Sequence, residues 1–276
     1  MIRPTVARLP LLGVLRFAGA DARRFLQGQL SNDLDLLSPE RPLRAGLLSA
    51  QGRVIAVLLL FTAGADVLAV LPRDLAEQVK QQLTRFVLRA KLRIEDVSDQ
   101  YAVYGVQDTL RRALRVQAVA EPPPAGEPQE AAAWQAADVA DGLPQIHAAT
   151  SGKFVAQMLN LDRIGAVSFT KGCYTGQEIV ARAHYRGRVK RRMQRFVARD
   201  TAPLVPGNRV QLAGGSTADV IAVAGTGAGV QDFLAVAPLP GGVRDDVSED
   251  SELPRIVAEP APLPYTLEDV DAPPAV

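Results

Sequence analysis

Residues 170–193, TKGCYTGQEIVARAHYRGRVKRRM, contain the side chains best suited to chemistry, because Cys173 is the only cysteine of the chain. Lys171 supplies positive charge nearby, while Gly172 and Gly176 leave the thiol uncrowded. Glycines also let backbone N–H groups approach an anion closely. This combination makes Cys173 a candidate nucleophile. The alternative is a buried cysteine that acts as a small hydrophobic side chain.

The spacing of Thr175 and Glu178 predicts how the thiol is positioned. They form an S/T-x-x-E capping box, so a helix is predicted to begin at Gly176. Cys173 would then lie near the positive end of the helix dipole, which favours thiolate over thiol. His184 lies 11 residues beyond Cys173, which is about 16 Å along a helix. We therefore expect a stacking or hydrogen-bonding surface histidine rather than a Cys–His dyad.

The same segment is strongly basic. Residues 182–195 contain seven Arg and Lys and no acid, whereas residues 241–276 contain nine Asp and Glu. One interpretation is contact with a phosphate backbone, with Tyr185 available to stack on a base. Another is a solvated basic face, and a third is that basic and acidic segments meet within one fold. The candidate nucleic-acid or partner contacts are Arg182, Arg186, Arg188, Lys190 and Arg191.

Composition argues against several classes of protein. The longest apolar run, VIAVLLLF at 54–61, is too short to cross a bilayer and suits a buried strand. The first 13 residues lack the features of a signal peptide, so we expect a cytoplasmic protein without membrane contact. One cysteine excludes an internal disulfide, and one cysteine with two histidines is too few for a zinc or iron–sulfur site unless carboxylates or a second chain contribute ligands. We therefore expect no permanently bound metal.

Hydrophobic periodicity predicts the elements around this segment. The first 106 residues predict the order β-α-β-β-α-β, an α+β pattern of ferredoxin-like type. Asp21 is predicted to cap the first helix, and Asp74 with Glu77 the second. The predicted elements are a strand at 10–20, a helix at 21–33, a β-meander at 43–71, a helix at 73–92, a strand at 92–106, a proline- and alanine-rich mobile loop at 119–133, a small β-barrel after 192 and one more edge strand within 253–269.

The segment KGCYTGQEIVARAHYRG closely resembles the K-G-C-Y-x-G-Q-E signature of the YgfZ family. These are folate-binding proteins related to the T-protein, the aminomethyltransferase of the glycine cleavage system. The resemblance extends over most of the chain, through AGADARRFLQGQLSND, DGLPQIHAATSGKFVAQMLNLDRIGAVSFTKGCY and the C-terminal PLPYTLED. The signature is long, so the resemblance is specific.

The resemblance implies a T-protein-like fold, in which ferredoxin-like α+β subdomains form a ring around a central tetrahydrofolate site. A small C-terminal β-barrel completes it. The implied parts are an N-terminal folate-binding subdomain at 1–118, the loop at 119–133, a second part of the folate-binding domain with the signature at 134–195, and a barrel with an acidic loop and a final strand at 196–276.

The resemblance also implies roles for residues. Cys173 matches the cysteine on which the family depends, and Trp134 matches a tryptophan that contacts folate, where a ring suits an aromatic ligand. The alternative for Trp134 is a core residue after a loop. A second family tryptophan falls at Leu12, which removes one aromatic wall, and residues 106–133 are shorter than expected. The other implied residues are Asn32, Asp33, Gln177 and Glu178 as cofactor contacts, and Lys171, Gly172, Tyr174 and Gly176 as signature positions.

The resulting hypothesis is a monomeric folate-binding accessory protein that supports iron–sulfur enzymes, and through them tRNA modification. Cys173 would be a reactive thiol or a transient ligand to a cluster held by a partner, so conventional turnover is not expected. A tetrahydrofolate-dependent one-carbon transferase using Asp33 is one alternative. A direct RNA-binding module using the basic segment is another.

Overall fold

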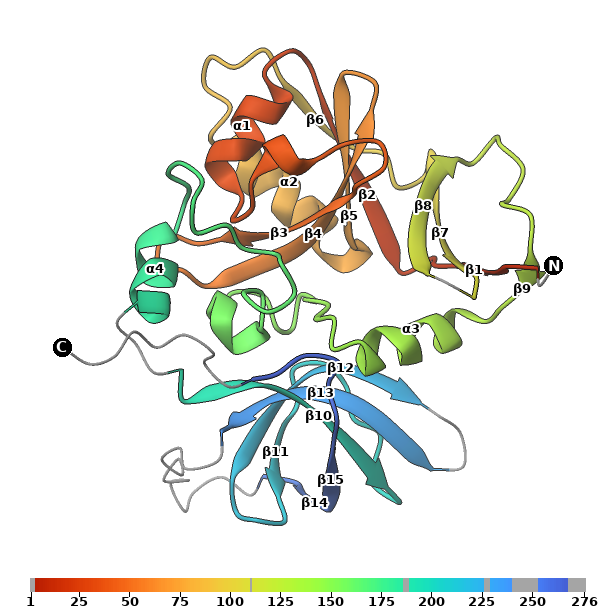
Figure 1. Cartoon of the computed structure of the whole chain (residues 1–276), viewed down its shortest axis with the longest axis vertical. Coiled ribbons are helices and arrows are strands. Elements are labelled where there is room, and N and C mark those ends of the chain that lie inside the picture. The colour runs from red at the N-terminus through yellow and green to blue at the C-terminus, as the bar shows by residue number, and fades with distance from the viewer. Residues whose placement is uncertain (1–2, 110, 186–188, 226–228, 240–252, 268–276) are drawn as a thin grey trace.

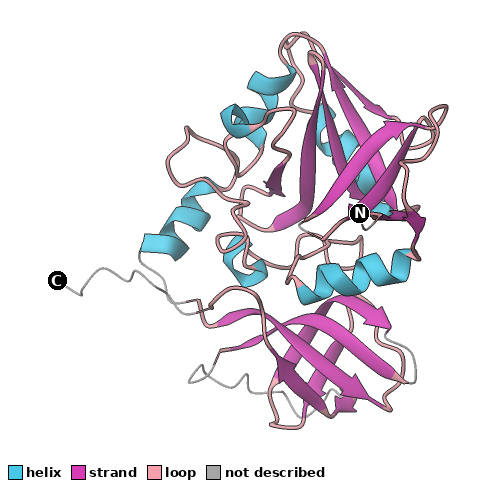
Figure 2. Ribbon diagram, turned by 45° about the vertical axis from the view of Figure 1, so that its right-hand side comes forward, coloured by secondary structure: helices cyan, strands magenta, loops and turns pink. Residues whose placement is uncertain are grey.

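The chain forms three lobes around a central helix (Figure 1). The computed structural model describes residues 3–109, 111–185, 189–225, 229–239 and 253–267. Each lobe is built on its own β-sheet, and helix α3 (Ala131–Ala140) lies between the barrel and the other strands in both ribbon views (Figures 1 and 2). No helix within these ranges is both long and apolar enough to span a bilayer. The predicted α+β fold with several sheets is confirmed.

The upper lobe is a five-stranded antiparallel sheet in the order β3-β4-β5-β2-β6. The apolar run at 54–61 lies in its central region, where most of the side chains of β4 are buried. The elements are β2 (Leu12–Ala18), α1 (Ala22–Gln29), the 3-10 turn η1 (Leu34–Leu36), β3 (Leu43–Leu48), β4 (Val54–Ala63), β5 (Asp66–Pro72), η2 (Arg73–Leu75), α2 (Ala76–Thr84) and β6 (Arg93–Asp96).

Several details of the predicted upper lobe are wrong. The meander contributes three strands rather than two, and the second helix ends at Thr84 instead of continuing to residue 92. Neither aspartate caps its helix, because each carboxylate binds a backbone N–H far away in the sequence. Asp21 accepts a hydrogen bond from the Lys91 N–H (2.7 Å), and Asp74 accepts one from the Ala148 N–H (3.0 Å). Tertiary partners have displaced the local capping bonds.

The second lobe is a four-stranded sheet in the order β8-β7-β1-β9. The predicted strand at 92–106 is in fact two strands, β6 and β7, which belong to different sheets. Part of the predicted loop at 119–133 is ordered, because β9 pairs with the free edge of β1 and α3 begins at Ala131. The strands are β1 (Thr5–Arg8), β7 (Tyr101–Gln107), β8 (Arg112–Ala118) and β9 (Glu127–Pro128).

The third lobe is the predicted C-terminal barrel, a nearly closed sheet in the order β14-β11-β12-β13-β10-β15. The two edge strands β14 and β15 flank the single residue Val257, so one short segment pairs with β11 on one side and β10 on the other. The stacked rings of Phe196 and Phe233, 5.6 Å apart, lie in its core. The strands are β10 (Arg191–Arg199), β11 (Arg209–Leu212), β12 (Thr217–Gly225), β13 (Val230–Pro238), β14 (Arg255–Ile256) and β15 (Ala258–Ala261).

The chain after the barrel returns to the centre of the molecule. The Tyr265 hydroxyl donates to the Gly142 carbonyl (2.8 Å) and lies 3.3 Å from the Asn160 amide. Gly142 has φ +65°, and a Cβ there would lie 2.5 Å from the tyrosine oxygen. Asn160 also binds the Met193 carbonyl on β10 (2.7 Å). The C-terminal segment therefore fastens the barrel to the central segment, which includes η3 (Ala156–Leu159) and leads to α4 (Gln177–Tyr185).

Candidate functional site

A cavity of about 330 Å³ lies between the sheet of the upper lobe, strand β8 and helix α3. Aliphatic side chains from β2, β4 and β5 form one wall, and polar side chains gather on the others. Such a mixture of apolar walls and a few polar groups is typical of sites for small organic ligands. The residues that matter below are Leu12, Arg44, Leu59, Arg112, Trp134, Asp138, Asp141 and Gln145.

Trp134 lines this cavity but is only 4% exposed. Gly105 on β7 packs against its six-membered ring so closely that a Cβ would come within 2.2 Å of it. The Arg112 guanidinium lies 4.1 Å from the ring centroid, in cation–π geometry. The indole is therefore both a core residue and a cavity wall. Leu12, at the second family tryptophan position, lines the same cavity, so the structure brings these two positions together.

Arg112 is held by an acidic pair. It forms ion pairs with Asp138 and with Asp141, the latter at 2.6 Å. Gln145 donates to the second oxygen of Asp138 (3.0 Å). Burial raises the pKa of the Asp138 carboxyl, although the Arg112 charge opposes the shift. The Arg112 Nε atom is buried and has no hydrogen-bond partner within the described ranges.

Arg44 differs from Arg112 in having no partner for its side chain. It projects from β3, is partly buried and lines the cavity. Within the described part of the chain its guanidinium makes no hydrogen bond and joins no ion pair. Burial lowers the pKa of Arg44, while the nearby charge of Asp138 raises it.

Sequence reasoning missed the polar residues of this cavity. Trp134 and Asp138 are separated by four residues, so they share one face of a helix, and this spacing was a usable signal. Arg44 and Arg112 lie on strands from two different sheets. No local pattern indicates that these two strands face one cavity.

A second cavity of about 380 Å³ adjoins the first. The two share Asp138, Leu143 and Gln145 as lining residues, and the barrel contributes Ala222 and Val223 to the second. The two cavities therefore adjoin at α3, and their combined lining comes from all three lobes. An elongated ligand would have more room here than either cavity provides alone.

The signature segment builds a different structure, anchored by Lys171. This side chain is only 9% exposed, and its ammonium donates to three backbone carbonyls, those of Gln27, Leu30 and Asn32, at 2.6 to 2.8 Å. Two of these carbonyls belong to the C-terminal end of α1, where a cation is favoured. Burial lowers the pKa of Lys171 to about 8. Lys171 therefore fastens the signature segment to the first helix.

Tyr174 and Gly176 form the second anchor. Tyr174 is buried, its ring centroid lies 5.3 Å from the Lys171 ammonium, and burial raises its pKa to about 12. Gly176 has φ +80°, and a Cβ there would lie 2.5 Å from the Ser49 carbonyl in the β3–β4 turn. The helix begins at Gln177, one residue later than predicted.

The predicted capping box between Thr175 and Glu178 is replaced by other contacts. The Gln177 side chain accepts from the Tyr174 N–H (3.3 Å), while Glu178 pairs with Arg182 one turn along α4 (2.8 Å). The side chain that accepts a hydrogen bond from the backbone before the helix is thus Gln177, whereas Glu178 was predicted. Glu178 and Gln177 serve the helix start, and neither lines the cavity of Trp134.

Between these anchors, Gly172 and Cys173 are exposed. A Cβ added to Gly172 would meet no atom within 4 Å, so the surface around the thiol is open. This contradicts the alternative of a buried cysteine. His184 stacks on Phe169 with ring centroids 3.9 Å apart, and Tyr185 packs edge-on at 4.7 Å. The prediction of a stacking surface histidine is confirmed.

Asn32 and Asp33 belong to the Lys171 anchor rather than to the cavity. Asn32 is buried, and its amide donates to the carbonyls of Arg44 and Gly165, both at 2.8 Å. Its side-chain oxygen accepts from the Asp33 N–H. Hydrogen bonds from the Gln27 side chain and the Asp35 N–H lower the pKa of Asp33. Neither residue lines either cavity described above.

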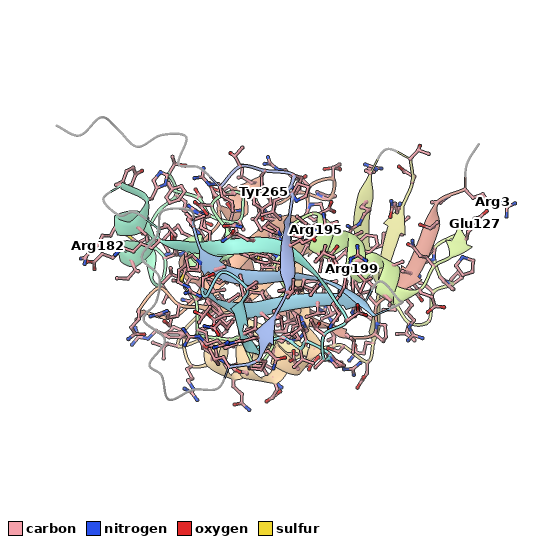
Figure 3. The ribbon with its side chains drawn as sticks, turned by 90° about the horizontal axis from the view of Figure 1, so that it is seen from below. Arg3, Glu127, Arg182, Arg195, Arg199 and Tyr265 are labelled. Carbon is pink, nitrogen blue, oxygen red and sulfur yellow. The ribbon has the colours of Figure 1, made fainter. Side chains whose placement is uncertain are left out.

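Much of the basic segment is engaged inside the fold. Arg191 pairs with Asp219 at 3.2 Å, the buried Arg192 with Asp162 at 2.9 Å and Arg195 with Asp232 at 2.6 Å. Thus these basic residues meet acids of the barrel and the central segment. Arg182 and Lys190 are exposed, and Figure 3 shows Arg182 at the edge of the molecule and Arg195 on the barrel. Arg186, Arg188 and the acidic loop at 244–252 lie outside the described residues.

The predicted site residues thus fall into two groups. Trp134 lies in the cavity, and the signature residues with Asn32 and Asp33 surround the base of the Cys173 segment. Cys173 is not among the residues that line either cavity. Across the described ranges, no three His, Cys, Asp or Glu side chains form a group suited to holding a metal ion.

Comparisons with known proteins agree with this fold. No family model matches the chain. It is 28% identical to the tRNA-modifying protein YgfZ of Yersinia pestis over 68% of this chain and 69% of the relative, and 29% identical to that of Shigella sonnei over 68% and 73%. The crystal structure of glycine cleavage system aminomethyltransferase T from Bartonella henselae superimposes with a TM-score of 0.63 at 12% identity, over 86% of this chain and 79% of that one. The resemblance to the YgfZ family and the T-protein-like fold are confirmed.

Proposed function

We propose that the protein binds tetrahydrofolate and acts as an accessory protein in tRNA modification, through iron–sulfur enzymes that it helps to mature or repair. The observation that carries this proposal is the cavity beside Trp134, which lies between two lobes of a T-protein-like fold. The names of the similar proteins support the link to tRNA modification. The YgfZ signature supports the roles of folate and of the thiol.

The residues of the cavity fit a folate. Carboxylates accept hydrogen bonds from N–H groups, and Asp138 and Asp141 offer such acceptors to the N–H edge of a pterin. Leu12 and Leu59 provide apolar walls for a planar ring, and Arg44 provides a cation for a ligand carboxylate. The adjoining cavity gives room for an elongated molecule. Tetrahydrofolate, when bound, would supply a carrier of one-carbon units.

Cys173 would act outside the cavity, at the surface. The open space around Gly172 lets another macromolecule reach the sulfur, and the buried anchors Lys171 and Tyr174 hold the segment in place. A single thiolate cannot hold an iron–sulfur cluster by itself, so a ligand role requires further ligands from a partner. Small thiols can supply these further ligands in place of protein side chains.

Titration of the purified protein with tetrahydrofolate tests the first part. Trp134 is the only tryptophan, so its fluorescence reports on one wall of the cavity. We expect saturable heat together with a change in tryptophan emission. Absence of both signals would overturn folate binding. The second part is tested in a bacterial host that lacks its own relative. There the unmodified chain should restore thiolated tRNA nucleosides and Cys173→Ser should not.

The two alternatives have less support. A one-carbon transferase would use Asp33, but among the described residues the carboxylates that line the cavity are those of Asp138 and Asp141. Measurable aminomethyl transfer to tetrahydrofolate would restore this alternative. Among the described candidate contacts, direct RNA binding would use the exposed Arg182 and Lys190, because Arg191 is paired within the barrel. A steep salt dependence of tRNA affinity, abolished by charge reversal at these two positions, would support it.

A further inference from the structure

We infer that Arg44 is the anion-binding group of the Trp134 cavity, and that this cavity selects its ligand by a carboxylate more than by ring stacking. The inference deepens the proposed function and rests on it, since the carboxylate would be one of those on the glutamyl part of folate. It concerns a residue for which the signature and the family positions gave no role.

The first argument is the difference between the two arginines of the cavity. Arg112 satisfies its charge with Asp138 and Asp141. The charges of those two carboxylates and of Arg112 influence the pKa of Arg44, so all three groups lie near it. Arg44 nevertheless forms no ion pair with either acid. Within the described residues its guanidinium has no hydrogen-bond acceptor.

The second argument is energetic. A partly buried cation without a partner is unfavourable, because burial removes water without replacing it. A guanidinium carries five N–H donors in a rigid fork that matches a carboxylate in a two-point contact. Charge-assisted hydrogen bonds of this kind are about twice as strong as neutral ones. A ligand carboxylate beside Arg44 would therefore satisfy a group that the protein leaves unsatisfied.

The third argument is that aromatic stacking is weak in this cavity. Leu12 stands where a second aromatic wall was expected, and Arg112 already lies over the Trp134 ring. Apolar contact with Leu12 and Leu59 remains, but it is not directional. Orientation of a ligand then depends on its polar ends. Arg44 is the lining cation that is free to supply it, among the residues the structure describes.

The test compares tetrahydrofolate with its glutamyl dimethyl ester, which keeps both rings but masks both carboxylates. Affinities are measured by calorimetry for the unmodified protein, for Arg44→Gln and for Arg41→Gln. Arg41 is an exposed arginine three residues earlier that does not line the cavity, so its change removes the same charge. We expect the unmodified protein and Arg41→Gln to prefer the acid about tenfold to a hundredfold, and Arg44→Gln to lose that preference.

Each outcome separates the inference from the proposed function. If Arg44→Gln keeps the full preference, or if the unmodified protein binds acid and ester equally, the inference is wrong while folate binding stands. If the unmodified protein binds neither ligand, both are wrong. Thermal unfolding of each variant checks the alternative of a structural role, because an unpartnered Arg44 predicts an unchanged or higher midpoint for Arg44→Gln. Should that variant fail to fold, the inference is wrong, since Arg44 would then be a structural residue.

Discussion

The cavity of Trp134 and the segment around Cys173 differ in whether their polar groups have hydrogen-bond partners within the protein. In the cavity, the Arg44 guanidinium and the Arg112 Nε have no hydrogen-bond partners within the described ranges. Beneath the thiol, Lys171 donates to three carbonyls and Asn32 uses both ends of its amide. Polar groups without hydrogen-bond partners that line a cavity suit ligand binding. A segment whose buried polar groups are all hydrogen-bonded suits the rigid positioning of one exposed side chain. The cavity is thus suited to binding a ligand, and the signature segment to exposing the Cys173 thiol.

The substitution expected to have the largest effect on stability is Gly176→Ala. The substitution forces an L-residue to φ +80° and places its Cβ 2.5 Å from the Ser49 carbonyl. We expect a loss of about 2–4 kcal/mol in the free energy of unfolding, measured with urea. Gly172→Ala is the matched control, because its Cβ meets nothing within 4 Å and its φ is not left-handed. Equal effects of the two changes would contradict the anchored-segment description.

Lys171→Met removes the lysine anchor of the signature segment. The three carbonyls of Gln27, Leu30 and Asn32 lose their common donor. A buried acceptor without a partner is costly, so we expect a loss of about 1–3 kcal/mol in the free energy of unfolding. The cavity lies elsewhere, so tetrahydrofolate affinity should remain within about twofold of the unmodified protein. A strong loss of affinity in a folded variant would show that the two regions are coupled.

The pH dependence of stability provides a separate test of Lys171. Its pKa is about 8 in the folded chain against 10.5 as the ordinary value. Between these values the unfolded chain holds a proton that the folded chain has released, so the free energy of unfolding should rise with pH across this window. The rise should be absent in Lys171→Met. The contribution of Tyr174, whose pKa is raised from 10.0 to about 12, has the opposite sign and begins only near pH 10. Urea unfolding between pH 7.5 and 9.5 therefore isolates the lysine.

Leu12→Trp would sharpen the description of the cavity by restoring an aromatic wall. Leu12 lines the same cavity as Trp134, so the new ring would face any ligand there. Aromatic contacts are worth about 0.5–1.5 kcal/mol beyond buried area, so we expect tetrahydrofolate to bind about twofold to tenfold more tightly. Calorimetry measures this change directly. Weaker binding would mean that the ligand already fills the space beside Leu12.

The smallest physical effect is expected for Cys173→Ser. The thiol is exposed, so its free energy of unfolding should change by less than about 0.5 kcal/mol. Its affinity for tetrahydrofolate should not change, because Cys173 does not line the cavity. Only the effect on thiolated tRNA in cells should be large. A marked fall in folate affinity would break the separation of the two regions.

The sequence by itself determined the fold class, the barrel and the signature, because these depend on local periodicity and on a long motif. It also predicted the stacking role of His184 from its distance along a helix, and an uncrowded thiol. Of the two glycines behind that second prediction, only Gly172 lies in open space, because Gly176 packs against the Ser49 carbonyl. Local signals failed where distant partners competed. Asp21 and Asp74 bind backbone groups of other segments instead of capping their helices, and the edge of β1 orders part of an apparent loop.

Only the tertiary structure decided which charged residues have partners. Arg191, Arg192 and Arg195 follow the exposed Lys190 within five residues, yet acids from the barrel and the central segment pair with them. Arg44 and Arg112 come from different sheets, and one is paired while the other is not. Whether a charged side chain has a partner depends on residues that lie far away along the chain. Sequence spacing describes only the nearest turns and strands, so it shows where a charge is but not what it meets.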